Sequence, residues 1–359
     1  VPEGWLIAAA GNPPEYNKSV REFDIVTLDR VRRMDIEADL DVWMEYAWKK
    51  EIHGSILAYL GMKKDHFYSV ENTVDGKFFV TARGWEDLSE ILKAYEELGV
   101  EITENLIGEY LCRDEIARSF FASYQLYRKY GEDYGLKRLL SGEMAEEEQQ
   151  KKVKMAEGAS FEERFLVTGL LLSGLNGSFL DYEKLDKETG AVYQELLHLK
   201  AFLHDKKDMT ALDEFTDVKK KSLAVRLEAE LLNLEQQTTE EFVIRTLEEF
   251  SFTIRKEHIT DTETGFERIR QLFTEMVEKR KDCAKKISRE LERAFAFMKA
   301  CFGDGQETVL FVTGLTRNSH AAAFIREYGC DPYFACSEKL LYRKQEKKLQ
   351  EECESLLKI

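Results

Sequence analysis

The residue pattern near the C-terminal end of the chain constrains the fold most strongly, because apolar side chains there recur at helical spacing over many turns. The recurrence is close to that of a heptad, which is typical of long helices packed along a shared seam. Helical periodicity alone explains the polar residues in between as solvated surface, although a long helical arm is also a common way to present a partner site. The seam consists of Ile269, Leu272, Phe273, Met276, Val277, Cys283, Ala284, Ile287, Leu291, Ala294 and Met298.

The composition predicts a folded, soluble protein. The chain has 359 residues, of which 43% are hydrophobic and 33% are charged, enough for two or three globular domains. Its net charge of -16 argues against a broad basic surface, so we expect neither nucleic acid nor a membrane as a partner. No apolar stretch reaches the roughly 20 residues of a membrane span, and no signal segment lies near the start. We therefore predict a cytoplasmic protein.

The first residues carry the signature of a buried strand. Residues 5–10, Trp-Leu-Ile-Ala-Ala-Ala, lack the alternation of a half-exposed strand and suit a strand covered on both faces, as in a parallel α/β sheet. Residues 31–36 are a second candidate strand. Because the chain opens on Val1 and enters the first candidate strand almost at once, we expect it to be a fragment of a longer protein. Residues 1–37 are assigned to the remnant of an α/β core.

The next segment, residues 38–140, is predicted to be a helical unit. Asp39 suits the N-cap of its first helix. Aromatic residues at helical spacing follow later in the segment, and helical periodicity assigns them to core packing. The first helix is expected to bury Val42, Tyr46, Ile52, Ile56 and Leu60, and the aromatic set comprises Phe120, Phe121, Tyr124 and Tyr127.

A hairpin and an arginine lie inside this helical unit. Residues 67–80 contain two β-prone runs around Asp75-Gly76, a dipeptide that tolerates the positive φ of a tight turn. The helix after the hairpin is predicted to start near Gly84, with acidic residues in its first turn and apolar residues on one face. Arg83 is therefore expected at the N-terminal end of this helix.

The C-terminal half is predicted to contain an arm and a cap. Residues 141–154 are rich in Glu, Gln and Lys, which indicates a solvated helix or a linker at a domain boundary. Residues 141–302 are assigned to a long-helix arm. Residues 303–359 predict a small α/β cap with a buried strand at 308–315, a short helix at 319–329 and a C-terminal helix. The expected fold is mainly α with small α/β parts.

Asn12 is the first candidate for chemistry. In a doubly wound α/β sheet, ligands bind just beyond the carboxyl ends of the strands, where Asn12 would stand after Gly11. Its amide offers both a donor and an acceptor, so it can orient a water molecule and contact a phosphate oxygen without adding charge. The alternative is that Asn12 only caps a turn before Pro13, and the position alone does not decide between the two.

Three separated motifs resemble one family. In order and spacing, "AAAGNPPEYN", "TLDR" and "VTARGWEDLSEIL" are similar to the back half of a MoxR-type ATPase of the AAA+ class. The resemblance covers residues 1–140 and implies an ATPase core remnant followed by a helical lid domain. It implies that Asn12 is sensor 1, which places the attacking water, and that Arg30 is the arginine finger, with Arg32 and Arg33 close enough to compete for that role.

The same resemblance implies that Arg83 is sensor 2, an arginine that contacts the nucleotide from a lid helix. The family commonly has Ser-Pro-Arg there, whereas Thr81 and Ala82 precede Arg83 in this chain. The missing proline predicts a less rigid entry to the helix. All three roles suit phosphoryl transfer, which depends on fixed positive charge and water positioning more than on covalent chemistry.

The chain also departs from the family. It has no G-x-x-x-x-G-K-[ST] phosphate loop and no apolar strand ending in the Asp-Glu pair that would hold magnesium, so we expect this piece to be inactive by itself, with no tightly bound cofactor. No metal site is predicted, because His198 and His204 lack the spacing of a zinc pair.

For the full-length parent, the resemblance implies ATP and Mg²⁺, a homo-oligomer that is a hexameric ring, and a partner carrying a von Willebrand factor A domain. It implies chaperone-like remodelling of a client protein or insertion of a metal or cofactor into it. The alternative from another class is a non-catalytic helical interaction scaffold, in which the arm and cap bind partners and nucleotide is no longer turned over.

Overall fold

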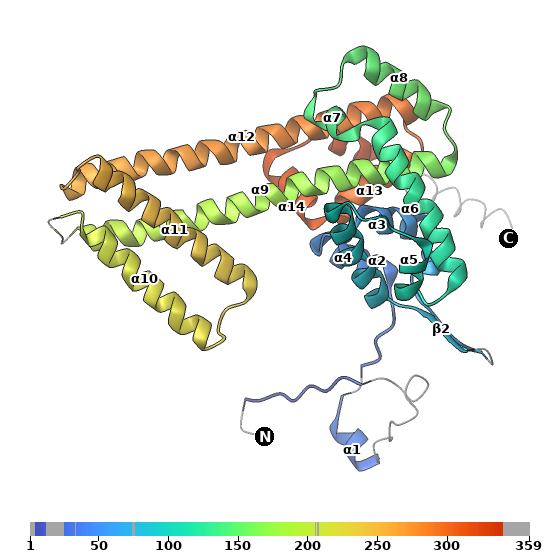
Figure 1. The fold of residues 1–359 in the computed structure, drawn as a ribbon, viewed down its shortest axis with the longest axis horizontal. Coiled ribbons are helices and arrows are strands. Elements are labelled where there is room, and N and C mark those ends of the chain that lie inside the picture. Colours follow the sequence, from blue (N-terminus) through green and yellow to red (C-terminus); the bar gives the residue numbers. More distant parts are fainter. Residues whose placement is uncertain are drawn as a thin grey trace, which may run out of the picture. The chain divides into compact units, whose positions relative to one another are not determined.

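The computed structural model describes residues 4–11, 25–32, 34–73, 76–204, 206 and 208–339. The chain divides into two units, residues 1–39 and 40–359, which are described separately below. The described residues are mainly helical, as the sequence predicts, and their sheet is a single two-stranded hairpin (Figure 1).

The first unit contains one described helix, α1 (Ile25–Arg30). The strand predicted at residues 5–10 does not form: this segment has no regular structure, and the side chains of Trp5 and Leu6 are 74% and 89% exposed. The described part of residues 31–36 is also without a strand. A strand covered on both faces needs neighbouring strands and packed helices, and the described residues of this unit supply neither.

The second unit starts with a bundle of helices around a hairpin. The hairpin is confirmed, and its antiparallel register runs from Ser69 opposite Val80 to Thr73 opposite Gly76. The aromatic set is confirmed as core, with Phe120, Tyr124 and Tyr127 buried and Phe121 partly buried. The elements are α2 (Leu40–Lys49), α3 (Gly54–Met62), a 3₁₀ turn (Lys64–His66), β1 (Ser69–Thr73), β2 (Gly76–Val80), α4 (Ala82–Leu98), α5 (Glu104–Tyr110), α6 (Asp114–Tyr134) and α7 (Leu136–Ser141).

The first predicted helix of this bundle is broken into two. Helix α2 ends at Lys49, and Glu51 adopts a left-handed φ of 53° that turns the chain into α3. Ile52, Ile56 and Leu60 are buried as predicted, but Val42 and Tyr46 on α2 are 65% and 39% exposed. The break rotates the two halves independently, so α2 buries Trp43, Ala47 and Trp48 instead.

The long helices predicted for the arm are confirmed. Helix α9 (Phe161–Leu203) has 43 residues and α12 (Thr262–Phe302) has 41, and they run side by side. Between them in sequence lie α10 (Ala211–Glu228) and α11 (Leu234–Lys256), which pack on each other and on the outer part of α9 (Figure 1). The polar stretch before the arm forms the solvated helix α8 (Glu146–Glu157), which buries only Ala156.

The predicted strand of the C-terminal cap is wrong. Residues 308–315 lie within α13 (Gln306–Arg317), which is followed by α14 (Ser319–Tyr328). The buried residues of α13 are Thr308, Phe311, Val312 and Leu315, which are spaced three, four and seven positions from the first, so one helical face is apolar. Packing of this face overrides the β-prone composition of the run. The helix predicted at residues 340–357 lies outside the described residues.

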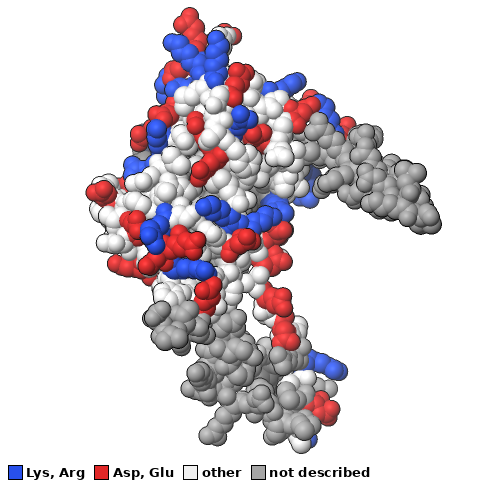
Figure 2. Space-filling model, turned by 90° about the vertical axis from the view of Figure 1, so that its right-hand side faces the viewer, with Lys and Arg blue, Asp and Glu red and all other residues white. Residues whose placement is uncertain are grey.

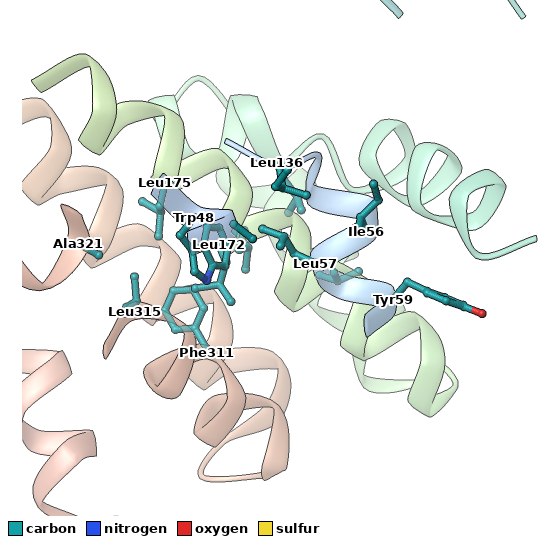
Figure 3. Close-up of a cluster of buried hydrophobic side chains, with 14 of the residues drawn as sticks. Trp48, Ile56, Leu57, Tyr59, Leu136, Leu172, Leu175, Phe311, Leu315 and Ala321 are labelled. Carbon is teal, nitrogen blue, oxygen red and sulfur yellow. The ribbon is translucent and has the colours of Figure 1, made fainter. Parts of the chain in front are cut away.

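One hydrophobic core is continuous through the helical bundle around the hairpin, the inner part of the arm helices and the C-terminal helices. Trp48 of α2 lies beside Leu172 of α9 and Phe311 of α13, so segments far apart in sequence share one packed cluster (Figure 3). We call this the body core. A separate core lies in the outer part of the arm, where α9, α10, α11 and α12 meet; we call it the arm core.

Candidate functional site

The three residues assigned to nucleotide chemistry fall in different parts of the chain. Asn12 lies outside the described residues, as does Arg33. Arg30 is the last residue of α1 in the first unit, and both Arg30 and Arg32 are exposed. Arg83 is in the second unit, in the first turn of α4. The structure therefore gives a local geometry for Arg30 and Arg83, and each is taken by itself.

Thr81 caps the helix that carries Arg83. Its backbone is extended, with φ of -134° and ψ of 162°, and its hydroxyl Oγ1 accepts a hydrogen bond from the backbone N–H of Gly84 at 3.2 Å. Serine and threonine are favoured at this position because the first helical N–H groups have no partner inside the helix. Thr81 is therefore the N-cap residue of α4.

Two buried anchors fix the first turn of α4. Gly84 packs so closely on α5 that a Cβ atom there would lie 2.8 Å from the backbone oxygen of Tyr110. Trp85 is fully buried, and its indole Nε1 donates to the backbone oxygen of Phe67 at 3.1 Å. The Trp85 ring also meets Phe120 edge-on at a centroid distance of 5.3 Å. These contacts fix the start of α4 against α5 and the residues before the hairpin.

Replacing Gly84 with alanine should destabilise the second unit by about 1–3 kcal/mol, because the new methyl group must displace a backbone carbonyl. The matched control is Gly108→Ala in α5, where an added Cβ meets nothing within 4 Å. There the higher helix propensity of alanine should raise stability by up to about 1 kcal/mol. Urea unfolding of the two variants measures both values, and equal effects would contradict the tight contact at Gly84.

The guanidinium of Arg83 is exposed and available. Among the described residues, no hydrogen bond or ion pair holds it. Glu86, one turn further on, accepts a hydrogen bond from the Tyr46 hydroxyl at 2.7 Å. An unpaired arginine beside the free N–H groups of a helix start is a favourable place for an anion, because the helix dipole and the side chain both contribute positive potential.

The bundle also contains a row of hydrogen-bonded serine, histidine and glutamate side chains, which the sequence analysis did not predict. His53 Nδ1 lies 2.7 Å from Ser55 Oγ, and His53 Nε2 lies 3.1 Å from Glu96 Oε2, which resembles the contacts of a hydrolase triad. Ser55 is only 1% exposed, however, so no substrate reaches its hydroxyl. His53 is the N-cap of α3 and accepts from the N–H of Ser55, which makes this row of side chains a structural cap.

Glu96 is held in its charged form by the same contacts. Burial alone would raise the pKa of this carboxyl, but hydrogen bonds from His53 and from the Tyr124 hydroxyl, the latter at 2.8 Å, lower the pKa below its ordinary value of 4.5. The pKa of Tyr124 is raised, first by burial and then by its hydrogen bond to Glu96. These groups stabilise the packing of α4 on α3 and α6.

The arm carries a shallow, open groove between α10 and α11, with a volume of about 260 Å³. Its apolar lining is formed by Leu223, Ala224 and Leu227 of α10 with Ile244 of α11, and Lys220 and Glu248 pair across it at 2.6 Å. The spacing of the α10 residues is visible in the sequence, but the groove depends on how α11 is placed. On the face drawn in Figure 2, basic and acidic side chains of the described residues alternate without an extended patch of one sign.

Neither a metal site nor a membrane span is found in the described part of the chain. Its histidine, cysteine, aspartate and glutamate side chains nowhere gather in a group of three that could hold a metal ion. None of its helices combines the length and apolarity that crossing a bilayer requires.

Comparison of the chain with protein-family models, with curated proteins and with solved structures gives no match. The geometry described above and the three sequence motifs therefore carry the functional argument.

Proposed function

We propose that this chain is the C-terminal part of a MoxR-type AAA+ ATPase, which couples ATP hydrolysis to chaperone-like remodelling of a client protein or to insertion of a metal or cofactor into it. The observation that carries the proposal is Arg83: an exposed, unpaired guanidinium on the first turn of a firmly anchored helix. A sensor 2 arginine needs an unpaired guanidinium on a backbone that is held in place. The reason is that positive charge stabilises a transferring phosphoryl group only if it is already in position.

The other two residues complete the proposed chemistry. Asn12 orients the water that attacks the γ-phosphate, and Arg30 neutralises the charge that develops on the triphosphate of a neighbouring subunit. Exposure of Arg30 at the end of α1 suits a residue that acts across a subunit boundary. The active form is then a homo-oligomeric ring, which we propose to be hexameric, with ATP and Mg²⁺ bound by an upstream segment and a von Willebrand factor A domain protein as partner.

The second candidate is a non-catalytic interaction scaffold, and the groove between α10 and α11 favours it. The upstream part of the open reading frame discriminates between the two. An intact phosphate loop with its lysine favours the ATPase, because that lysine contacts the β- and γ-phosphates. A phosphate loop with the lysine replaced, or no loop at all, favours the scaffold.

Arg83→Ala in the full-length ATPase should weaken ATP binding by about ten-fold to a hundred-fold, the loss expected for one hydrogen bond to a charged group. The ratio kcat/KM should fall by the same factor, because the same contact is kept in the transition state. Isothermal titration with a non-hydrolysable ATP analogue measures the affinity, and phosphate release measures the turnover.

The matched control is Arg128→Ala, an exposed arginine on α6 of the same bundle, for which we expect wild-type affinity and turnover. If Arg83→Ala behaves like this control, Arg83 is not a sensor and the proposed function loses its main support. Circular dichroism on both variants excludes misfolding as the cause of a loss.

A further inference from the structure

The body core and the arm core are separated by a segment that belongs to neither. The body core ends at Tyr182 on α9 and at Cys283 on α12, counting its partly buried members. The arm core begins only beyond residues 183–190 of α9 and 277–282 of α12. We call these two segments the neck. In Figure 1 the neck lies where α9 and α12 run side by side between the body and the α10–α11 end of the arm.

Arg280 of α12 forms the centre of a polar network in the neck. Its guanidinium donates to Asp186 of α9 at 2.5 Å, to the hydroxyl of Tyr182 at 2.7 Å and to Glu327 of α14 at 3.0 Å. Tyr182 in turn shares a hydrogen bond of 2.6 Å with Tyr328 of α14. One arginine therefore joins both arm helices to a helix of the body.

A second set of ion pairs ties the neck to both sides. Lys187 of α9 pairs with Glu183 of the same helix at 2.8 Å and with Glu235, in the first turn of α11, at 2.6 Å. Glu183 also contacts His320 of α14. The neck is thus held by charged and hydrogen-bonded groups, whereas the regions on either side are held by apolar packing.

The backbone of α9 is locally weak at the same place. Gly190 lies in the helix interior, and an added Cβ would meet nothing within 4 Å, so packing does not require a glycine there. A glycine in a helix interior costs about 0.5–1 kcal/mol relative to alanine. The hydroxyl of Thr189 donates to the backbone oxygen of Leu185 at 2.7 Å, a contact that favours helix bending.

We propose that the neck is a flexible joint between the body and the arm, and that the Arg280 network sets its stiffness. With the network intact, the arm keeps one direction relative to the body. When the network is weakened, α9 and α12 bend at the neck while the two hydrophobic cores stay intact. The exposed fractions of the side chains, 24% for Arg280, 44% for Asp186 and 49% for Glu327, leave these ion pairs open to screening, so salt should loosen the joint.

The test measures the distance between the body and the arm in the full chain. Spin labels attached through a non-natural amino acid, which avoids the six native cysteines, are placed at two exposed positions, Leu98 in the body and Phe252 of α11, in the part of the arm beyond the neck. Arg280→Met should broaden the distance distribution at low salt, and 1 M salt should broaden the wild-type distribution towards that of the variant. The control is Arg289→Met, an exposed arginine on the same helix, which should match the wild type.

Hydrogen exchange of the neck amides gives a second test, in which two variants should change the exchange rate in opposite directions. Arg280→Met should accelerate exchange in residues 183–190 by about five-fold, the effect of losing roughly one kcal/mol of local stability. Gly190→Ala should slow exchange there and narrow the distance distribution, because alanine has a higher helix propensity than glycine. Unchanged widths in both variants, or a wild-type distribution that does not respond to salt, would overturn the proposal. Arg280→Lys keeps the charge, so its exchange rate and the width of its distance distribution should lie between those of the wild type and Arg280→Met. Intermediate values would show that the effect of Arg280→Met does not come from misfolding.

Discussion

Arg30→Ala should abolish ATP turnover in the full-length ring while leaving nucleotide affinity unchanged. An arginine supplied across a subunit boundary contributes about 10³-fold to 10⁵-fold to the rate of phosphoryl transfer, because it neutralises charge that exists mainly in the transition state. It contributes little to ground-state binding for the same reason. Steady-state phosphate release gives the turnover number, and titration with a non-hydrolysable analogue gives the affinity.

Two comparisons make the Arg30 result decisive. The neighbours Arg32 and Arg33 should each tolerate alanine with near wild-type turnover, and a collapse at one of them in place of Arg30 would move the finger to that residue. Mixed rings should also recover activity when Arg30→Ala subunits are combined with subunits lacking the phosphate-loop lysine, because each then supplies what its neighbour lacks. Loss of nucleotide binding in Arg30→Ala would mean that the residue belongs to the binding site and not to the subunit boundary.

Trp48→Ala should lower the free energy of unfolding of the second unit by about 3–5 kcal/mol, the usual cost of truncating a buried large aromatic side chain. Trp48 is 5% exposed and packs where α2, α9 and α13 meet, so the truncation leaves a cavity between three segments that are distant in sequence (Figure 3). Chemical denaturation followed by circular dichroism measures the change.

Val42→Ala on the same helix is the control for Trp48. Its side chain is 65% exposed, so the expected change is within about 0.5 kcal/mol. A similarly small change for Trp48→Ala would show that α2 is not held by the body core, and the continuity of that core from the bundle to the C-terminal helices would have to be abandoned.

The elements that the sequence predicted correctly have one strong local signal. The seam of α12 repeats over many turns, and the hairpin has both its β-prone runs and its turn dipeptide, so neither depends on distant residues. Residues 308–315 show the opposite case. Their β-branched composition suggested a strand, while the spacing of Phe311, Val312 and Leu315 already fitted one helical face, and packing against the body core decided the outcome.

Some contacts around Arg83 can also be predicted from the sequence, and others cannot. The cap at Thr81 can be predicted from sequence, since its partner Gly84 is three residues away. The contact of Gly84 with Tyr110 and the hydrogen bond from Trp85 to Phe67 join segments that are distant in sequence, so no local sequence pattern predicts them. The continuous apolar run at residues 5–10 is also a local signal, which suits a strand covered on both faces but does not tell whether a neighbouring strand is present.

The length of α9 has a mechanical consequence. At a rise of 1.5 Å per residue, its 43 residues extend for about 65 Å, so a tilt of about ten degrees at the inner end would sweep the outer end through roughly 11 Å. A rotation of this size therefore displaces the outer end by about the length of two helical turns. Amplification of this kind requires no new contact at the outer end, only that α9 stays straight at the neck, as it does when the Arg280 network is intact.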